Sequence, residues 1–326
     1  MIALVDEQFM PAESQSSEGC FHVPVLLRET VAALEPAPGK LFLDGTVGGG
    51  GHSLALLEAG ALVIACDQDL EALDEASTRL GHYSDSVRII ESNFADVAER
   101  LSELGVTALD GVLLDLGVSS HQLDTPVRGF SFMREGPLDM RMGPHVRRTA
   151  AEIVNEDSQE ELARIFFEFG EESAGMRIAA HLVKMRRRLP IRTTSDLVNA
   201  IESVIPRRGP KHPATKVFQA LRIAVNDELG VLERSLHALS GCIKGGGRMA
   251  VITFHSLEDR IVKRYFKAVS QEWIDRPEWG APRRNPSHAF RLVTGRPVTP
   301  SEEEARKNSR ARSAKLRVIE RITHES

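Results

Sequence analysis

A run of glycines follows a short apolar segment and could bring the main chain close to a ligand. The run reads Asp44-Gly45-Thr46-Val47-Gly48-Gly49-Gly50-Gly51-His52. Glycine at a strand-to-helix turn lets the backbone approach a bound molecule that side chains would block. The dinucleotide spacing G-x-G-x-x-G fails here, because the third position counted from Gly48 is Ser53. A nicotinamide-dependent oxidoreductase is therefore disfavoured, and a cofactor turn or an unliganded turn remain.

Acidic residues stand where three predicted strands end, at Asp44, Asp67 and Asp115. A carboxylate beside the glycine run would repel a pyrophosphate. S-adenosylmethionine has no phosphate, and its amino group and sulfonium are cationic, so an acid at this position suits it. A carboxylate at the end of the second strand can also accept hydrogen bonds from both ribose hydroxyls. We therefore predict S-adenosylmethionine as the cofactor and methyl transfer as the reaction.

Two other residues near this turn are open to more than one interpretation. Phe94 follows the third strand and is placed either to lie against an adenine or to fill the core. His52 either begins a helix or takes part in chemistry.

The cysteines bear on which atom would be methylated. Methylation at carbon 5 of cytosine needs a cysteine nucleophile beside the cofactor. Cys20 lies near the terminus, Cys66 lies inside a strand, and Cys242 precedes three glycines, so carbon-5 chemistry is disfavoured. Their odd number and wide spacing also argue against disulfides and against a zinc site, and they fit a cytoplasmic protein.

Short apolar segments alternate with helical patterns in the first third of the chain. Strand–helix–strand order of this kind builds a parallel sheet that is covered on both faces, which predicts an α/β fold. Asp69 is expected to cap a helix that stops at Gly81. The predicted strands are Lys40–Asp44, Ala61–Asp67, Val87–Glu91, Asp110–Leu116 and Arg248–Phe254.

Helical patterns replace this alternation between the fourth and fifth strands. Ser158 and Glu161 have capping-box spacing. A helix is expected over Thr193–Ile205, and another starts near Pro213 and continues to Leu236. We predict a helical insert over residues 130–220 within an α/β domain whose two parts span 22–129 and 221–322.

Charge is distributed unevenly along the chain. The net charge is −5, but residues 184–222 hold ten basic residues against two acids, a local balance of +8. Residues 305–321 hold seven basic residues against one acid. Such segments indicate either nucleic-acid contacts or solvated helix faces. No apolar run approaches the length of a membrane span, and the first residues do not form a signal peptide pattern.

Several motifs, in order, resemble one family: the bacterial small-subunit ribosomal RNA (cytosine-N4) methyltransferases, known as RsmH or MraW. The similar segments cover residues 22 to about 320. They are His22-Val23-Pro24-Val25-Leu26-Leu27, Asp44–Ser53, Leu113-Leu114-Asp115-Leu116-Gly117-Val118-Ser119-Ser120, Arg128–Met133, Gly136–Met142, Lys211–Thr215, Phe218–Arg222 and Thr253-Phe254-His255-Ser256-Leu257-Glu258-Asp259-Arg260.

The resemblance implies a class I, Rossmann-like methyltransferase whose helical insert helps to recognise RNA. It implies N4 methylation of a cytidine in the decoding centre of 16S ribosomal RNA, with the small ribosomal subunit as partner. The cofactor contacts that it implies fall on Gly50, Gly51, His52, Asp67, Phe94, Asp115 and Gln122. One departure is Gly49, where many relatives carry a larger residue. The stretch 273–286 and the first twenty residues match poorly and receive no role.

The motifs leave the catalytic residue and the oligomeric state open. The Asp/Asn-Pro-Pro-aromatic motif of many amino-methyltransferases is replaced here by Asp115-Leu116-Gly117-Val118. Asp115 and Asp139 are possible acceptors for the substrate amine, and Asp139 is equally well placed for a salt bridge with Arg141. A methyltransferase with another substrate and a non-catalytic ribosome-assembly scaffold are the alternative functions.

Overall fold

A seven-stranded sheet forms the body of the protein, in a computed structural model that describes residues 24–207, 209 and 212–323. The order is β3-β2-β1-β4-β5-β9-β8; the first five strands are parallel, and β9 is antiparallel to both of its neighbours. This confirms the predicted α/β class with a mainly parallel sheet. The strands are β1 Leu41–Asp44, β2 Leu62–Asp67, β3 Val87–Glu91, β4 Leu109–Asp115, β5 Ile243–Thr253, β8 Phe290–Leu292 and β9 Lys315–Arg321.

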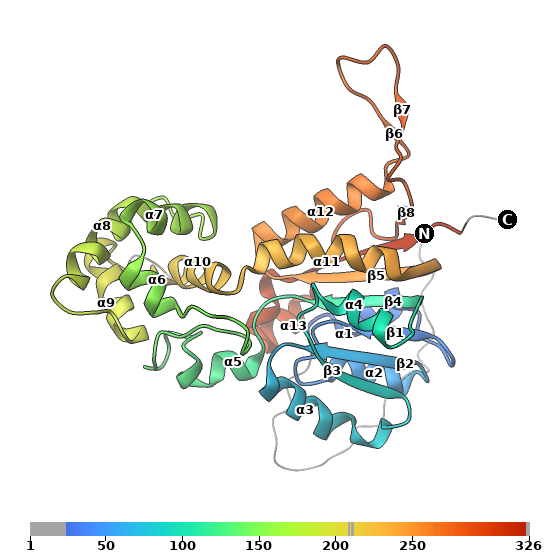
Figure 1. Cartoon of the computed structure of the whole chain (residues 1–326), viewed down its shortest axis with the longest axis horizontal. Helices are drawn as coiled ribbons and strands as arrows, with labels where there is room; N and C mark the ends of the chain where they lie inside the picture. Colours follow the sequence, from blue (N-terminus) through green and yellow to red (C-terminus); the bar gives the residue numbers. More distant parts are fainter. Residues whose placement is uncertain (1–23, 208, 210–211, 324–326) are drawn as a thin grey trace.

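Helices cover both faces of this sheet (Figure 1). One apolar layer contains Leu34, Leu57 and Leu73, and the opposite layer contains Leu101, Leu236 and Phe266. The first layer comes from α1 Leu27–Leu34, α2 Gly51–Glu58 and α3 Leu70–Leu80, and the second from α4 Val97–Glu103, α11 Glu228–Cys242 and α12 Ser256–Ser270. The strand order reverses between β1 and β4, the position at which sheets of this type bind ligands.

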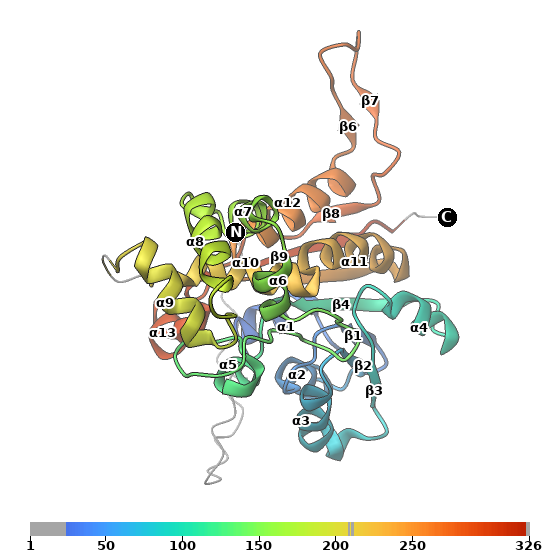
Figure 2. The same cartoon turned by 60° about the vertical axis from the view of Figure 1, so that its left-hand side comes forward.

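A group of five helices stands beside the sheet and packs around a core of its own (Figures 1 and 2). Its buried side chains include Phe166, Leu182 and Leu197. The apolar stripe of each helix faces its neighbours, as expected for amphipathic helices. The helices are α6 Ala150–Glu156, α7 Gln159–Glu168, α8 Gly175–Arg186, α9 Thr194–Val204 and α10 Ala214–Asn226.

The single long helix predicted from Pro213 to Leu236 was wrong, because the chain breaks at Asp227. This residue has φ +48, a left-handed conformation that ends α10 and precedes α11. The apolar stripe continues across the break, but its residues pack into two different cores. Leu221 packs within the helical group, whereas Leu232 packs on the sheet. A straight helix could not reach both cores.

The local helix predictions met different outcomes. α3 ends at Leu80, which confirms the predicted stop at Gly81, and Gly81 then begins a short 3-10 helix, Gly81–Tyr83. Ser158 caps α7 by accepting from the Glu161 amide, but the Glu161 carboxylate binds Arg164 instead of completing the capping box. Asp69 caps α3 as predicted, accepting from the backbone of Glu71.

Candidate active site

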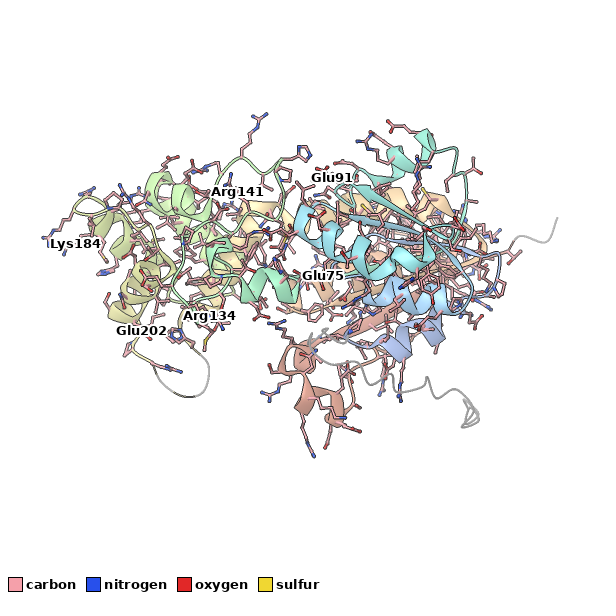
Figure 3. All side chains as sticks on the ribbon, turned by 90° about the horizontal axis from the view of Figure 1, so that it is seen from below. Glu75, Glu91, Arg134, Arg141, Lys184 and Glu202 are labelled. Atoms are coloured by element: carbon pink, nitrogen blue, oxygen red, sulfur yellow. The ribbon has the colours of Figure 1, made fainter. Side chains whose placement is uncertain are left out.

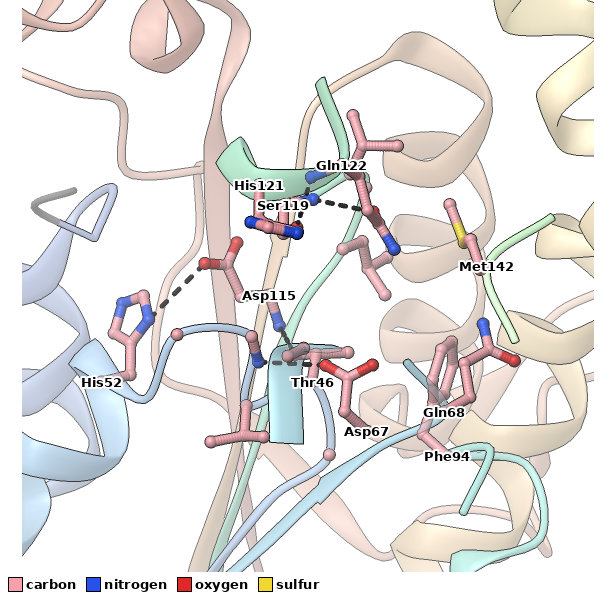
Figure 4. Close-up of a pocket in the computed structure, with 18 of the residues that line it drawn as sticks. Thr46, His52, Asp67, Gln68, Phe94, Asp115, Ser119, His121, Gln122 and Met142 are labelled. Atoms are coloured by element: carbon pink, nitrogen blue, oxygen red, sulfur yellow. Dashed lines mark hydrogen bonds and ion pairs between the residues drawn. The ribbon is translucent and has the colours of Figure 1, made fainter. Parts of the chain in front are cut away.

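A cavity lies at the carboxyl ends of β1, β2 and β4, next to the glycine run (Figure 4). Parallel strands present their last residues along one edge, so side chains distant in sequence meet there. The floor comes from residues 45–49 and from Asp67 and Asp115. The start of α11 and the start of α12 close the opposite side with Glu228 and Glu258.

The glycine run has little room for side chains on either side. A Cβ on Gly51 would lie 2.3 Å from Pro24 Cγ, and one on Gly49 would lie 2.5 Å from Glu75 Oε1. The Glu75 carboxylate thus occupies the space beside Gly49. Gly50 has φ +78 and precedes α2, with its amide donating to Val47. It is not among the residues that line the cavity.

Asp67 and Asp44 hold the turn from beneath. Asp67 accepts from the Gly48 and Asp69 amides at 3.0 Å each, and it lines the cavity. Asp44 is buried, accepts from Ser53 Oγ at 2.7 Å, and does not line the cavity. Burial raises the pKa of both carboxyls to about 6. A negative charge on either carboxyl is therefore unfavourable unless a cation binds close to it.

Asp115 faces His52 across the cavity (Figure 4). His52 Nδ1 lies 3.5 Å from Asp115 Oδ2, while Asp115 Oδ1 is shielded from solvent and has no hydrogen-bond partner among the described residues. Burial lowers the pKa of His52 to about 4, so this ring is neutral at pH 7. Burial, with the charges of Asp44 and Glu258, raises the pKa of Asp115 well above its ordinary value. An acceptor without a partner in such a place points to a bound donor.

Phe94 and Gln122 also line the cavity, on opposite sides of it (Figure 4). Gln122 lies in the short helix α5, Ser120–Asp124. Its side chain accepts from the Ser119 amide at 3.0 Å and donates to Asp69 Oδ2 at 2.7 Å. These bonds fix the loop after β4 against the start of α3. Of the seven predicted contacts, all except Gly50 lie at the cavity.

Sequence reasoning missed the cavity wall at the start of α12. Glu258 follows His255 at capping-box spacing and accepts from the Phe254 amide at 2.8 Å. Burial alone would raise its pKa, but the His255 bond and charge and the Arg222 charge outweigh burial, and the net pKa shift is downward. The surroundings of Glu258 and Asp115 therefore shift the two pKa values in opposite directions. Pairs of acids driven apart in this way mark acid–base roles.

Glu228, His255 and Glu258 place one donor atom each within 4.8 Å of one another. This is the closest approach to a metal-ligand set within residues 24–207, 209 and 212–323. Arg222 donates to both oxygens of Glu228 at 2.8 Å. Because that guanidinium already neutralises Glu228, the set suits an ion-pair network better than a cation, and we assign no metal to it.

Asp139 lies outside the cavity lining. Its carboxylate accepts from Arg141 Nε and Nη2 at 2.8 Å each. The salt-bridge interpretation of Asp139 is the one that the structure supports, and the residue is not a substrate acceptor in this geometry. Asn226 lies in the cavity wall instead. Its amide donates to Met140 and accepts from the Met142 backbone, which holds this loop at the cavity.

The two basic segments differ in how many of their cations are paired within the chain. All seven cations of residues 305–321 bind acids or carbonyls of this chain; for example, Arg310 binds Asp124 and Arg317 binds Asp259. In the segment 184–222, Arg222 and Lys216 are internally paired and Arg186 donates to a backbone carbonyl. Exposed cations that remain there are Lys184, Arg187, Arg188, Arg192 and Arg207; Arg208 and Lys211 lie outside the described residues. Figure 3 shows Lys184 at the outer end of the helical group.

Comparison with known proteins places this site in a family. A profile of the MraW methylase family matches residues 19–322. The chain is 50% identical over 308 residues to a protein of Magnetococcus marinus, covering 92% of this chain and 98% of that one. It is 47% identical over 308 residues to a protein of Heliobacterium mobile, covering 92% and 99%. Both are called Ribosomal RNA small subunit methyltransferase H. The chain belongs to the MraW methylase family, and it is a methyltransferase that uses S-adenosylmethionine, as the sequence predicts.

Proposed function

We propose that this enzyme methylates N4 of a cytidine in the decoding centre of 16S ribosomal RNA. The relatives named above support a small-subunit ribosomal RNA as the substrate. The observation that carries the proposal is the unpartnered Asp115 Oδ1 in a cavity lined by carboxylates and, within the part of the chain that the structure describes, by no thiol. Cys66 Sγ is instead buried in β2 and donates to the Ser92 carbonyl. An exocyclic amine, with two hydrogens to donate, fits such a lining.

The cavity also fits the cofactor. It combines a glycine turn that is open beside Gly48 with two carboxyls, Asp67 and Asp115, that form no ion pair with a lysine or arginine of the described residues. When bound, S-adenosylmethionine supplies an electrophilic methyl group on a sulfonium. We propose that Gly51, His52, Asp67, Phe94 and Gln122 hold it, whereas Gly50 acts through the shape of the turn.

The remaining chemistry falls to the acidic side chains. The N4 lone pair of cytosine is delocalised into the ring, so N4 is a weak nucleophile until acceptors bind its hydrogens. Asp115 can accept one of them through Oδ1. After methyl transfer N4 carries an additional proton, and a carboxylate with a raised pKa can take it. Glu258, held ionised nearby, stabilises positive charge at the amine.

Methyl transfer and RNA binding would fall to different parts of the chain. We propose that residues 22–129 and 221–322 carry methyl transfer and that the insert, 130–220, holds RNA through its exposed cations. The described residues include no helix long and apolar enough to cross a membrane. A cytoplasmic location belongs with this proposal, because ribosomal subunits are assembled there.

Product analysis tests the function. Purified enzyme and labelled cofactor are incubated with 30S subunits from a strain lacking the activity, and the modified nucleoside is mapped by mass spectrometry. N4-methylcytidine in the decoding centre is expected. 5-Methylcytidine would overturn the chemistry, methylation elsewhere would overturn the target, and no turnover would favour the scaffold alternative.

Cofactor affinity should depend on pH in the range where the buried acids titrate. Below about pH 6 Asp67 and Asp44 are protonated in the free protein, so a cationic ligand must displace protons in order to bind. As pH is lowered below about 6, affinity for S-adenosylmethionine should fall roughly tenfold per pH unit for each carboxylate involved. Above about pH 7 the affinity should no longer depend on pH. In the free protein, Asp44 and Asp67 should each contribute more stability as pH falls from about 6 toward 4, because their raised pKa values favour proton uptake by the folded state, whereas His52, with its lowered pKa, contributes in the opposite direction.

Calorimetric titrations at several pH values check this expectation. S-adenosylhomocysteine, which lacks the sulfonium charge, is the control and should show a shallower dependence. Equal slopes for both ligands would show that the buried carboxylates do not sense the sulfonium.

Removing exposed cations from the insert should weaken RNA binding without affecting the cofactor. Changing Lys184, Arg187 and Arg188 to Gln removes counterion release at up to three phosphates. The slope of log affinity against log salt should become less steep by about 0.7–0.9 for each lost contact.

The matched control changes Arg88, Arg100 and Lys244, which lie on other parts of the sheet domain, to Gln. Filter binding of 16S RNA at several salt concentrations measures both variants, and calorimetry measures cofactor affinity. If both triple variants bind RNA equally well, the insert cations are only a solvated surface.

A further inference from the structure

A hairpin arm extends from the end of α12, over residues 271–289. Its strands are β6 Trp273–Ile274 and β7 Arg283–Arg284, and they pair with each other rather than with the main sheet. Figures 1 and 2 both show the arm standing away from the body. Both tryptophans of the chain, Trp273 and Trp279, lie in it.

The arm exposes aromatic surface and arginines together. Trp273 is 53% exposed. Arg276 and Arg283 lie over the Trp279 ring, at 5.1 and 4.8 Å from its centroid. A two-stranded hairpin gains little stability from its own ladder, and an exposed tryptophan adds none. Side chains of these types are the common anchors of binding surfaces.

Polar bonds fix the direction of the arm relative to α12. Asn285 is buried, and its side-chain amide donates to the carbonyls of Ala268 and Gln271 at 2.6 and 2.7 Å. The Asn285 backbone amide also donates to the Glu272 carbonyl. These bonds satisfy the carbonyls at the end of α12, so the helix and the arm form one unit.

The exposed face of α12 adds positive charge next to the arm. Lys263, Arg264 and Lys267 are exposed, and no acid occurs between Asp259 and Glu272. From residue 263 to 284 six basic residues face three acids, a balance of +3 in a chain of net charge −5. At the base of the arm a groove of about 840 Å³ is lined by Arg264, His237 and Tyr265, among other residues.

We propose that this α12–arm surface is a second RNA-binding surface, separate from the insert. We define it as Lys263, Arg264, Lys267, Trp273, Arg276, Trp279, Arg283 and Arg284. The cations contact phosphates, and Trp273 stacks on an unpaired base, the combination used by proteins that bind single-stranded nucleic acid. A symmetric dimer through this surface would bring like charges together, which disfavours a second copy as the occupant. The inference rests on the proposed RNA substrate.

Intrinsic fluorescence gives a direct test, because both tryptophans report on the arm. Protein-free 16S RNA transcript, which has no tryptophan, is titrated into the enzyme. We expect quenching that saturates in parallel with filter retention. Trp273→Phe should abolish most of the quenching, since it leaves only Trp279 as a reporter. Retention of RNA with unchanged emission, or no retention at all, would overturn the proposal.

Affinity measurements complete the test. Trp273→Ala should weaken RNA binding on the order of tenfold, the usual scale for one stacked base. Changing Lys263, Arg264 and Lys267 to Gln should reduce the salt slope by about 2. The Arg88, Arg100 and Lys244 variant is the control and should change neither quantity.

Failure of the α12–arm proposal can be distinguished from failure of the proposed methylation of 16S ribosomal RNA. If wild-type enzyme methylates 30S subunits while α12–arm variants bind RNA and methylate normally, the surface is wrong and the proposed function stands. Dissociation of a dimer by Trp273→Ala, seen by sedimentation, would assign the arm to self-association and would also overturn the proposal.

Discussion

Replacing Asp115 with asparagine is expected to slow methyl transfer by about 10²–10⁴-fold, the usual range for a lost acid–base group. Asparagine keeps an oxygen that can accept from the substrate amine, but it cannot take up the proton that N4 must lose. Burial raises the pKa of Asp115, which suits it to that task. Single-turnover methylation of 30S subunits at saturating cofactor measures the rate of the chemical step.

A matched control separates catalysis from folding and from cofactor binding. Asp85 is exposed and distant from the cavity lining, so Asp85→Asn should behave like the wild type. Calorimetry should show that Asp115→Asn still binds S-adenosylmethionine. If the variant methylates at the full rate, Asp115 is not the proton acceptor; if it loses only cofactor affinity, Asp115 is a cofactor contact alone.

Replacing Asp67 with alanine should weaken cofactor binding by one to a few orders of magnitude. Hydrogen bonds to a charged acceptor contribute roughly 1.5–3 kcal/mol each, and two ribose hydroxyls are the proposed donors. Asp67 also binds the Gly48 and Asp69 amides, so its loss loosens the turn as well.

Asp67→Asn and Asp74→Asn distinguish these effects. The amide in Asp67→Asn keeps one acceptor oxygen for the turn but lowers the charge facing the ligand. Asp74 is exposed on α3 and serves as the control. Calorimetry gives the affinities, and thermal unfolding reports on the turn. Unchanged affinity in both Asp67 variants would remove this residue from the cofactor site.

The cavity residues at the strand ends could be predicted because their signals are local. A parallel strand that is buried on both faces reads as a continuous apolar run, and the acid that ends it is visible in the sequence. Asp67 and Asp115 therefore appear at strand ends in both the prediction and the structure. The cap at Asp69 was equally local.

The cavity wall at the start of α12 could not be predicted in the same way, because its partners are distant in sequence. Glu258 faces Asp115 only because β5 lies beside β4 in the sheet. The basic segment at residues 305–321 had the composition of a nucleic-acid contact, yet its cations bind acids such as Asp124 and Asp259 or backbone carbonyls of this chain. Local charge counts cannot show such pairing.

The break at Asp227 bears on whether the helical group can be removed from the rest of the protein. Asn226, the last residue of α10, holds the backbone of Met140 and Met142, and α11 begins at once with Glu228 in the cavity wall. Excising residues 130–220 would remove Met142 from the wall and leave the buried Asn226 amide with the Arg222 carbonyl alone, a costly loss of its bonds to Met140 and Met142. The insert is therefore not a detachable accessory, and the two cores should melt in one cooperative transition rather than as independent units.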